Sequence, residues 1–204
     1  MLLPPPPLAA HVALLGDAAF LLLVVSLHFL EREFDPSWRM LSEYSLGRFG
    51  WLMRIAFVGL GLGCLGDALA TWPAMASAGG RVGVALLATI GLFGGAAAFF
   101  DTDPITTPPE RLTRRGKIHN VCGVTFILGF PVPATLVARG LASSPAWVAA
   151  RPWLLAATLL TWAGVLVLFG AFVYFGRRHH GTSAGPDMRI GWRIASSRRP
   201  TSRG

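Results

Sequence analysis

The sequence is poor in charged residues and almost without lysine. Only 14% of its 204 residues are charged, whereas 53% are hydrophobic. Soluble domains carry about 25% charged residues, so this composition excludes an ordinary soluble domain and favours a membrane protein. Lys117 is the one lysine among the eighteen basic residues, and such a preference for arginine is typical of GC-rich bacterial genomes.

Cysteine is also scarce, and no metal-binding or phosphate-binding motif is present. Cys64 and Cys122 each lie in an apolar run and have no second cysteine close by in the sequence. This spacing argues against a disulfide framework and a zinc site, so we expect two small buried thiols. No HExxH, paired HxxxH or Gly-rich phosphate loop occurs. We therefore predict neither a metal nor a cofactor.

The net charge is strongly positive, but its distribution argues against nucleic acid as a partner. The formal charge is +8 and the isoelectric point is about 11.2. The basic residues lie in short connections between apolar runs and in the C-terminal segment. Membrane proteins place basic residues in this way on their cytoplasmic side.

Long apolar runs make up most of the chain. At 1.5 Å per residue, each is long enough to cross a hydrocarbon layer of about 30 Å. We therefore predict an all-α integral membrane bundle at residues 8–175, preceded by a Pro-rich segment (1–7) and followed by a basic, disordered tail (176–204). The five predicted transmembrane helices are residues 8–30, 51–71, 82–100, 118–138 and 153–175.

Glycine and proline add detail to these helices. Gly59 with Gly63, and Gly91 with Gly95, are spaced as in helices that approach one another closely in a membrane. Prolines at 131 and 133 each remove a backbone donor, so the fourth span should kink or open near its middle.

The basic residues also predict an orientation. With five spans, one side of the membrane receives only Arg81, Arg139 and Arg151, and the other side receives all the remaining lysine and arginine. The positive side is normally cytoplasmic. We predict a bacterial inner-membrane protein with its N-terminus outside and its C-terminus in the cytoplasm.

The central polar loop, residues 101–120, is the first candidate site. Asp101 and Asp103 follow the third span, His119 begins the fourth, and Glu43 lies on the same predicted side. These four residues could act as acid, base or metal ligand. The favoured interpretation is a clasp of carboxylates neutralised by nearby cations, and a catalytic or metal site is the alternative. The cations available within the loop are Arg111, Arg114, Arg115 and Lys117.

Two further sets of residues are candidates for binding and transport. The basic residues near the predicted cytoplasmic interface could bind anionic lipid headgroups. These are Arg48, Arg54, Arg114 and Arg115. Asp17 and Asp67 lie within predicted spans, where an acid is expected to face the bundle interior. They could form a proton or cation relay, or they could be simple protonated or hydrogen-bonded acids.

Three stretches of the chain resemble a known family. LSEYSLGRFGW at 41–51, FFDTDP at 99–104 and GKIHNVCGV at 116–124 are similar to DUF998, a domain of unknown function in bacterial membrane proteins. The resemblance implies a compact bundle of six transmembrane helices with no established activity, cofactor or ligand. This chain departs from the pattern near Gly191, where members begin a sixth apolar helix and a polar segment stands here. We hypothesise a truncated or frameshifted end, which would leave the fifth span with a face toward lipid or a second subunit.

Together these observations predict a multi-pass membrane protein with a non-enzymatic role, either in binding membrane lipids or a partner or as a structural protein. The partner would be another membrane protein or a second copy of the chain. One alternative is a lipid-active membrane enzyme that uses Glu43, Asp101, Asp103 and His119. A small transporter that uses Asp17 and Asp67 is the other.

Overall fold

The computed structural model describes residues 7–178, in which helix is the one kind of regular element. Five stretches of this part of the chain are long and apolar enough to cross a membrane, so the predicted all-α membrane fold is confirmed. They are Leu8–Leu30, Gly50–Ala74, Ala78–Phe99, Arg114–Ala142 and Pro145–Tyr174. Residues 1–6, residues 179–204 of the predicted tail and the expected position of the sixth helix lie outside the described residues.

Six α-helices and five short 3₁₀ turns form these spans and their connections. The α-helices are α1 (Pro7–Leu30), α2 (Gly50–Thr71), α3 (Ala78–Ala96), α4 (Arg114–Gly129), α5 (Pro131–Ala142) and α6 (Arg151–Arg178). The 3₁₀ turns are η1 (Leu41–Leu46), η2 (Trp72–Ala74), η3 (Ala97–Phe99), η4 (Pro109–Arg111) and η5 (Pro145–Ala150).

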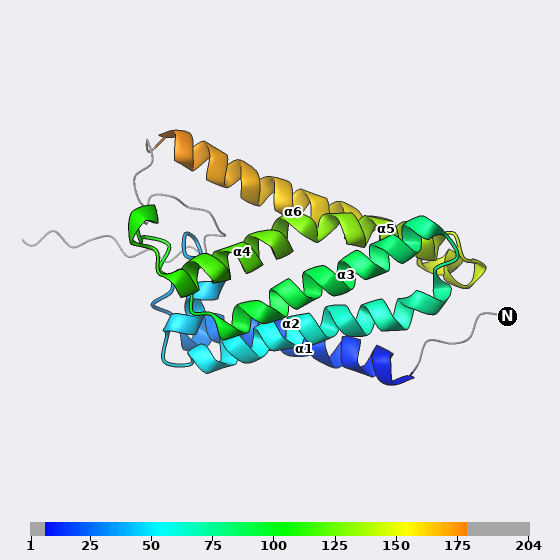
Figure 1. Ribbon diagram of the computed structural model, residues 1–204, viewed down its shortest axis with the longest axis horizontal. Helices are drawn as coiled ribbons and strands as arrows, with labels where there is room; N and C mark the ends of the chain where they lie inside the picture. The colour runs from blue at the N-terminus through cyan, green and yellow to red at the C-terminus, as the bar shows by residue number, and fades with distance from the viewer. Residues whose placement is uncertain (1–6, 179–204) are drawn as a thin grey trace, which may run out of the picture.

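The helices follow one another across the molecule in sequence order. α1 packs on α2, α2 on α3, and α3 on both α4 and α5, while α6 packs on α5 (Figure 1). α1 packs on α2 and α4 packs on α3, whereas α1 and α4 have no extensive contact with each other. Part of the surface of α2 and α3 therefore lies between α1 and α4. We call one end of the bundle the loop end. It contains the connector 31–49, the loop 100–113 and the C-terminal end of α6, on the left of Figure 1.

Glycines allow the first three helices to approach closely. A methyl group at Gly61 would lie 2.8 Å from the Cα of Gly95, and one at Gly59 would lie 2.9 Å from the carbonyl oxygen of Gly16. Real side chains do not tolerate such distances, so these backbones are in direct contact. The predicted close approach at the two glycine pairs is confirmed.

The fourth span is divided, as its prolines predict. α4 ends at Gly129 and α5 begins at Pro131, with Phe130 between them. Pro131 and Pro133 are both buried and cannot donate the backbone hydrogen bonds that a continuous helix needs. The chain crosses this interruption without leaving the bundle, and α5 packs on α3.

The last helix is attached at one end of its length. α6 packs on α5 and η5, and none of its most apolar window is buried. Nε1 of Trp162 donates a hydrogen bond to Oγ1 of Thr135, at 2.9 Å. Toward the loop end α6 diverges from α4 (Figure 1).

Two buried clusters hold the remaining helices together. One joins α1, η1 and α2 at the loop end, around Leu27, Tyr44 and Met53. The other joins α2, α3 and α5, and includes Cys64. Cys64 and Cys122 are both free and buried, as predicted.

Candidate functional site

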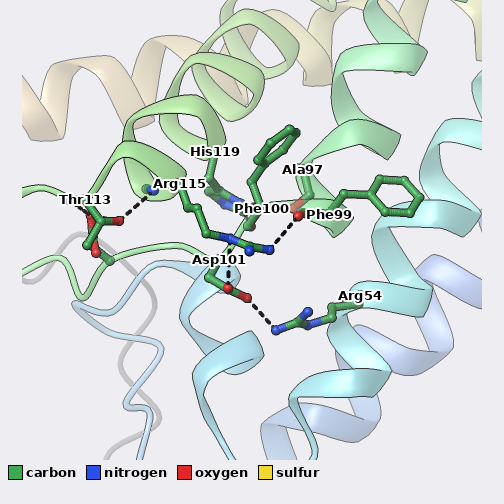
Figure 2. Close-up of polar contacts among 10 residues, drawn as sticks. Arg54, Ala97, Phe99, Phe100, Asp101, Thr113, Arg115 and His119 are labelled. Carbon is green, nitrogen blue, oxygen red and sulfur yellow. Dashed lines mark hydrogen bonds and ion pairs between the residues drawn. The ribbon is translucent and has the colours of Figure 1, made fainter.

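Asp101 is the centre of an ion-pair clasp at the loop end. It pairs with Arg54 of α2 and with Arg115 of α4, whose Nε lies 3.2 Å from Oδ2 of Asp101 (Figure 2). Arg115 also donates to the carbonyl oxygen of Phe99, at 3.1 Å. The side chains of Asp101, Arg54 and Arg115 are 42%, 47% and 61% exposed. Exposed pairs stabilise a fold by about 0–1 kcal/mol, so the clasp mainly fixes the relative positions of α2 and α4.

Asp103 organises the start of α4. Its Oδ2 accepts hydrogen bonds from the backbone N–H and the hydroxyl of Thr113, at 2.8 Å and 3.2 Å. Thr113 in turn caps α4 by accepting from the N–H of Gly116, at 3.0 Å. A methyl group at Gly116 would overlap the Asp103 carboxylate. Asp103 therefore lies near a helix N-terminus, where a negative charge is favourable.

Glu43 ties the connector to the central loop. It is completely buried, and its Oε1 accepts from Arg39 Nη1 at 2.9 Å and from the N–H of Ile105 at 3.0 Å. Oε2 accepts from the N–H of Met40 at 2.9 Å. Burial of a carboxylate is tolerated when it is paired and hydrogen-bonded in this way.

His119 is held in one orientation by two backbone carbonyl groups. The residue is 4% exposed, and Nδ1 lies 3.1 Å from the oxygen of Ala97 and 3.0 Å from that of Phe100. Carbonyl oxygens only accept hydrogen bonds, so Nδ1 carries the hydrogen. In the neutral ring Nε2 is then an acceptor. The ring also meets Phe57 edge-on, at 5.7 Å between centroids.

A mainly apolar cavity lies beside His119. Its volume is about 190 Å³, and its lining comes from α1, the connector, α2, η3, α3 and α4. A cavity of about 150 Å³ accommodates benzene, and drug-sized sites measure about 300–1,000 Å³. This cavity therefore fits one ring or a segment of a chain. Ser42, Asn120 and His119 are its polar members, and Phe20, Phe57, Leu60, Val124, Phe126 and Ile127 are among its apolar ones.

The clasp and the cavity are adjacent along the helices. Arg54 precedes Phe57 by three residues in α2, and Arg115 precedes His119 by four residues in α4. Residues at these spacings share a helix face. The charged clasp therefore lies about one turn, roughly 5.4 Å, from the apolar cavity toward the loop end.

The other two predicted lipid-binding arginines lie outside the clasp. Arg48 is exposed, with its guanidinium 5.4 Å from the ring centroid of Phe49. Arg114 is exposed at the start of α4. The structure thus brings together Arg54 and Arg115 from this set, and leaves Arg48 and Arg114 facing outward at the same end.

Asp17 and Asp67 lie at the interface of α1 and α2. A methyl group at Gly63 would overlap the Asp17 carboxylate, so this acid faces α2 as predicted. Asp67 follows Gly63 by one helical turn and is half-buried. Neither acid lines the cavity beside His119.

Sequence reasoning missed Glu31, which follows α1 directly. It is 1% exposed and accepts a hydrogen bond from the N–H of Phe49. Burial raises the pKa of Glu31 above its ordinary value, and the neighbouring Glu33 raises it further, while the Phe49 amide and Arg48 act in the opposite direction. A methyl group at Gly47 would overlap its carboxylate. The available signal was an acid placed directly at the end of an apolar run.

No three His, Cys, Asp or Glu residues gather closely enough to hold a metal ion within residues 7–178. Comparison with known proteins found one family model, described as a protein of unknown function (DUF998), that matches residues 14–191. The comparisons matched no curated protein and no solved structure.

Proposed function

The chain belongs to the DUF998 family of proteins of unknown function, and we propose that it binds a membrane lipid, without catalysis, at the cavity beside His119. The observation that carries this proposal is the apolar cavity one helical turn from the Asp101 clasp. A lipid has two corresponding parts at a similar separation. Its hydrocarbon chain would occupy the apolar cavity, and its polar headgroup would lie at the clasp.

The cavity has the right size and lining for part of a lipid chain. Its volume of about 190 Å³ admits a chain segment, and the rest of the chain would lie along the groove between α1 and α4. Lipid tails are as apolar as these side chains, so shape and close packing would determine affinity more than hydrophobicity.

The clasp has the right charge for an anionic headgroup. Two arginines share one carboxylate, so Arg54, Arg115 and Asp101 carry a net charge of about +1. All three are partly exposed and can exchange partners. A basic residue near the membrane surface contributes about 1 kcal/mol to the binding of anionic lipid.

The proposal places the protein in the bacterial inner membrane with the loop end in the cytoplasm. Arg81, Arg139 and Arg151 lie at the start of α3, the end of α5 and the start of α6, all at the opposite end of the bundle. The described basic residues of the loop end outnumber them. This distribution supports a cytoplasmic loop end.

The contacts of the acids favour binding over the alternative of a lipid-active enzyme. Glu43 and Asp103 accept backbone hydrogen bonds, and Asp101 is shared by two arginines. Each carboxylate thus has a structural task, as expected for a clasp. The remaining alternative, transport through Asp17 and Asp67, would use the α1–α2 interface instead of this cavity.

Filling the cavity is the direct test. Gly123 lines the cavity, and a side chain at this position would meet no atom within 4 Å of its Cβ. We predict that Gly123→Leu reduces cross-linking of an anionic phospholipid with a diazirine in its acyl chain to residues 120–127 by at least about fivefold. Such a loss corresponds to about 1 kcal/mol of binding free energy. Cross-links would be mapped by mass spectrometry in lipid nanodiscs.

Gly164→Leu in α6 is the matched control. Gly164 also has open space around its Cβ, and it does not line the cavity. Both variants replace a helical glycine, so both should gain similar helix stability, about 1 kcal/mol. Equal cross-linking to residues 120–127 in Gly123→Leu, Gly164→Leu and the wild type would overturn the proposal.

A further inference from the structure

His119 lines a mainly apolar cavity, and in the neutral tautomer with Nδ1 as donor its Nε2 is a hydrogen-bond acceptor. Nδ1 is committed as a donor to the carbonyl oxygens of Ala97 and Phe100. The ring is nine-tenths or more buried and lines the cavity. Since the neutral ring has one hydrogen, Nε2 presents a lone pair.

The neighbours of His119 in the cavity wall are largely carbon. Phe57 presents its ring edge-on to the imidazole, and apolar side chains make up most of the remaining lining. A hydrocarbon chain alone would cover Nε2 without giving it a hydrogen, which is unfavourable for a buried polar group. Within residues 7–178 no protein group donates to Nε2, so a ligand could supply this hydrogen.

We propose that the cavity recognises a lipid that bears a hydroxyl group, and that this hydroxyl donates its hydrogen to Nε2 of His119. Ser42 and Asn120 line the same cavity and carry donors that suit the hydroxyl oxygen. A neutral ligand group with acceptors alone, such as an ether or an ester, cannot make the bond to Nε2. A ligand carboxylate would place an acceptor oxygen against the acceptor Nε2, which is unfavourable.

This inference rests on the proposed function, and it adds a chemical class to the ligand. It also gives His119 a role in specificity that its backbone contacts do not require. If the only role of His119 were to join α4 to η3, its Nδ1 contacts would be sufficient. The chemical group that faces Nε2 would then have no effect on binding.

A pair of matched probes tests the hydroxyl. Dodecan-1-ol and 1-methoxydodecane would compete with the diazirine phospholipid for cross-linking to residues 120–127 of the wild-type protein in nanodiscs. The two probes share a chain and an oxygen, but only the alcohol can donate. We expect the alcohol to compete about tenfold more strongly, a ratio that corresponds to about 1.4 kcal/mol.

His119→Phe should abolish this preference, because phenylalanine keeps the aromatic contact with Phe57 and has no acceptor. The substitution also removes the two Nδ1 contacts and could therefore alter the structure. A second measurement is for this reason made on the wild-type protein. With ¹⁵N-labelled histidine, the Nε2 resonance of His119 should shift on addition of the alcohol and stay in place with the ether.

The outcomes separate the two proposals. Equal competition by alcohol and ether, or an alcohol preference that persists in a folded His119→Phe variant, would overturn the hydroxyl inference and leave lipid binding intact. An Nε2 resonance that ignores the alcohol would do the same. Cross-linking that is insensitive to Gly123→Leu would overturn the proposed function itself.

Discussion

At the scale of single residues, the loop end is built from acids that bind backbone N–H groups. Glu31 accepts from Phe49, Glu43 from Met40 and Ile105, and Asp103 from Thr113. Each bond joins segments that are distant or irregular in the chain. The acids thus replace the regular hydrogen bonding that loops lack.

Glu31 predicts a pH dependence of stability. Its pKa is higher in the folded protein than its ordinary value of 4.5, chiefly because it is buried. Between these two pKa values the folded state holds the proton that the unfolded state has lost, so the free energy of unfolding falls as pH rises through this window. We expect Glu31→Gln to flatten this dependence and to raise the unfolding temperature at neutral pH.

The measurement is the thermal unfolding midpoint in detergent as a function of pH. Glutamine keeps an acceptor for the N–H of Phe49, so the hydrogen bond is conserved. Glu110→Gln, at an exposed position in η4, is the control. A Glu31→Gln curve parallel to that of the wild type would contradict the assignment.

At the scale of elements, contact between glycine backbones decides how α1, α2 and α3 pack. Gly16 meets Gly59 and Gly63, while Gly61 meets Gly95. Because lipid provides no hydrophobic force between helices, such close packing is a main source of association. A second local feature shapes the bundle: the fourth span is divided at Phe130, because the two prolines that follow cannot donate helix hydrogen bonds.

Gly61→Ala should therefore destabilise the bundle. The alanine Cβ would lie 2.8 Å from the Cα of Gly95. The atoms that it meets belong to the backbone of α3, which cannot move away as a flexible side chain could. We expect a loss of about 1–3 kcal/mol, the usual cost of overpacking. Unfolding in mixed micelles would measure it.

Gly170→Ala in α6 is the matched control, because its Cβ meets nothing within 4 Å. It should be neutral or stabilising by up to about 1 kcal/mol. Equal stability of the two variants would show that the α2–α3 contact is looser than described.

At the scale of the whole molecule, the helices of residues 7–178 form an open series instead of a closed ring. α6 packs on α5 and η5, and its apolar outer surface is exposed. The cavity, whose lining includes residues of α1 and α4, and the exposed apolar faces of α6 are the surfaces that we expect to meet lipid. The prediction of a second copy of the chain or another membrane protein as a partner for these faces stays a prediction.

The proposed orientation can be tested by cysteine labelling. Cys64 and Cys122 are buried, so they should react poorly with an impermeant maleimide. Thr106 and Ala76 are exposed at opposite ends of the bundle. We expect Thr106→Cys to react in inverted membrane vesicles and Ala76→Cys in right-side-out ones. The reverse pattern would place the loop end outside.

Much of the fold could be predicted from the sequence, because hydropathy is a local property. Each apolar run is long enough to span a membrane by itself, and the run at 118–138 contains the prolines that interrupt it. Glycine spacing likewise identified the close helix contacts. These features depend on residues within a few turns of one another.

The partners of the polar residues could not be predicted in the same way. The sequence offered cations within the central loop for Asp101, and the structure uses Arg115 from that set together with Arg54 from α2. Glu31 was missed because its partner, Phe49, lies across the connector.

The sequence by itself determined the spans, the interrupted helix and the polar character of the loop end. The tertiary structure alone decided which acid meets which donor, and that an apolar cavity opens beside His119. The physical reason is that the free energy of placing a segment in lipid is a sum over residues that are neighbours in the sequence. The hydrogen-bond partner of a polar side chain depends instead on the register between helices that are distant in the chain.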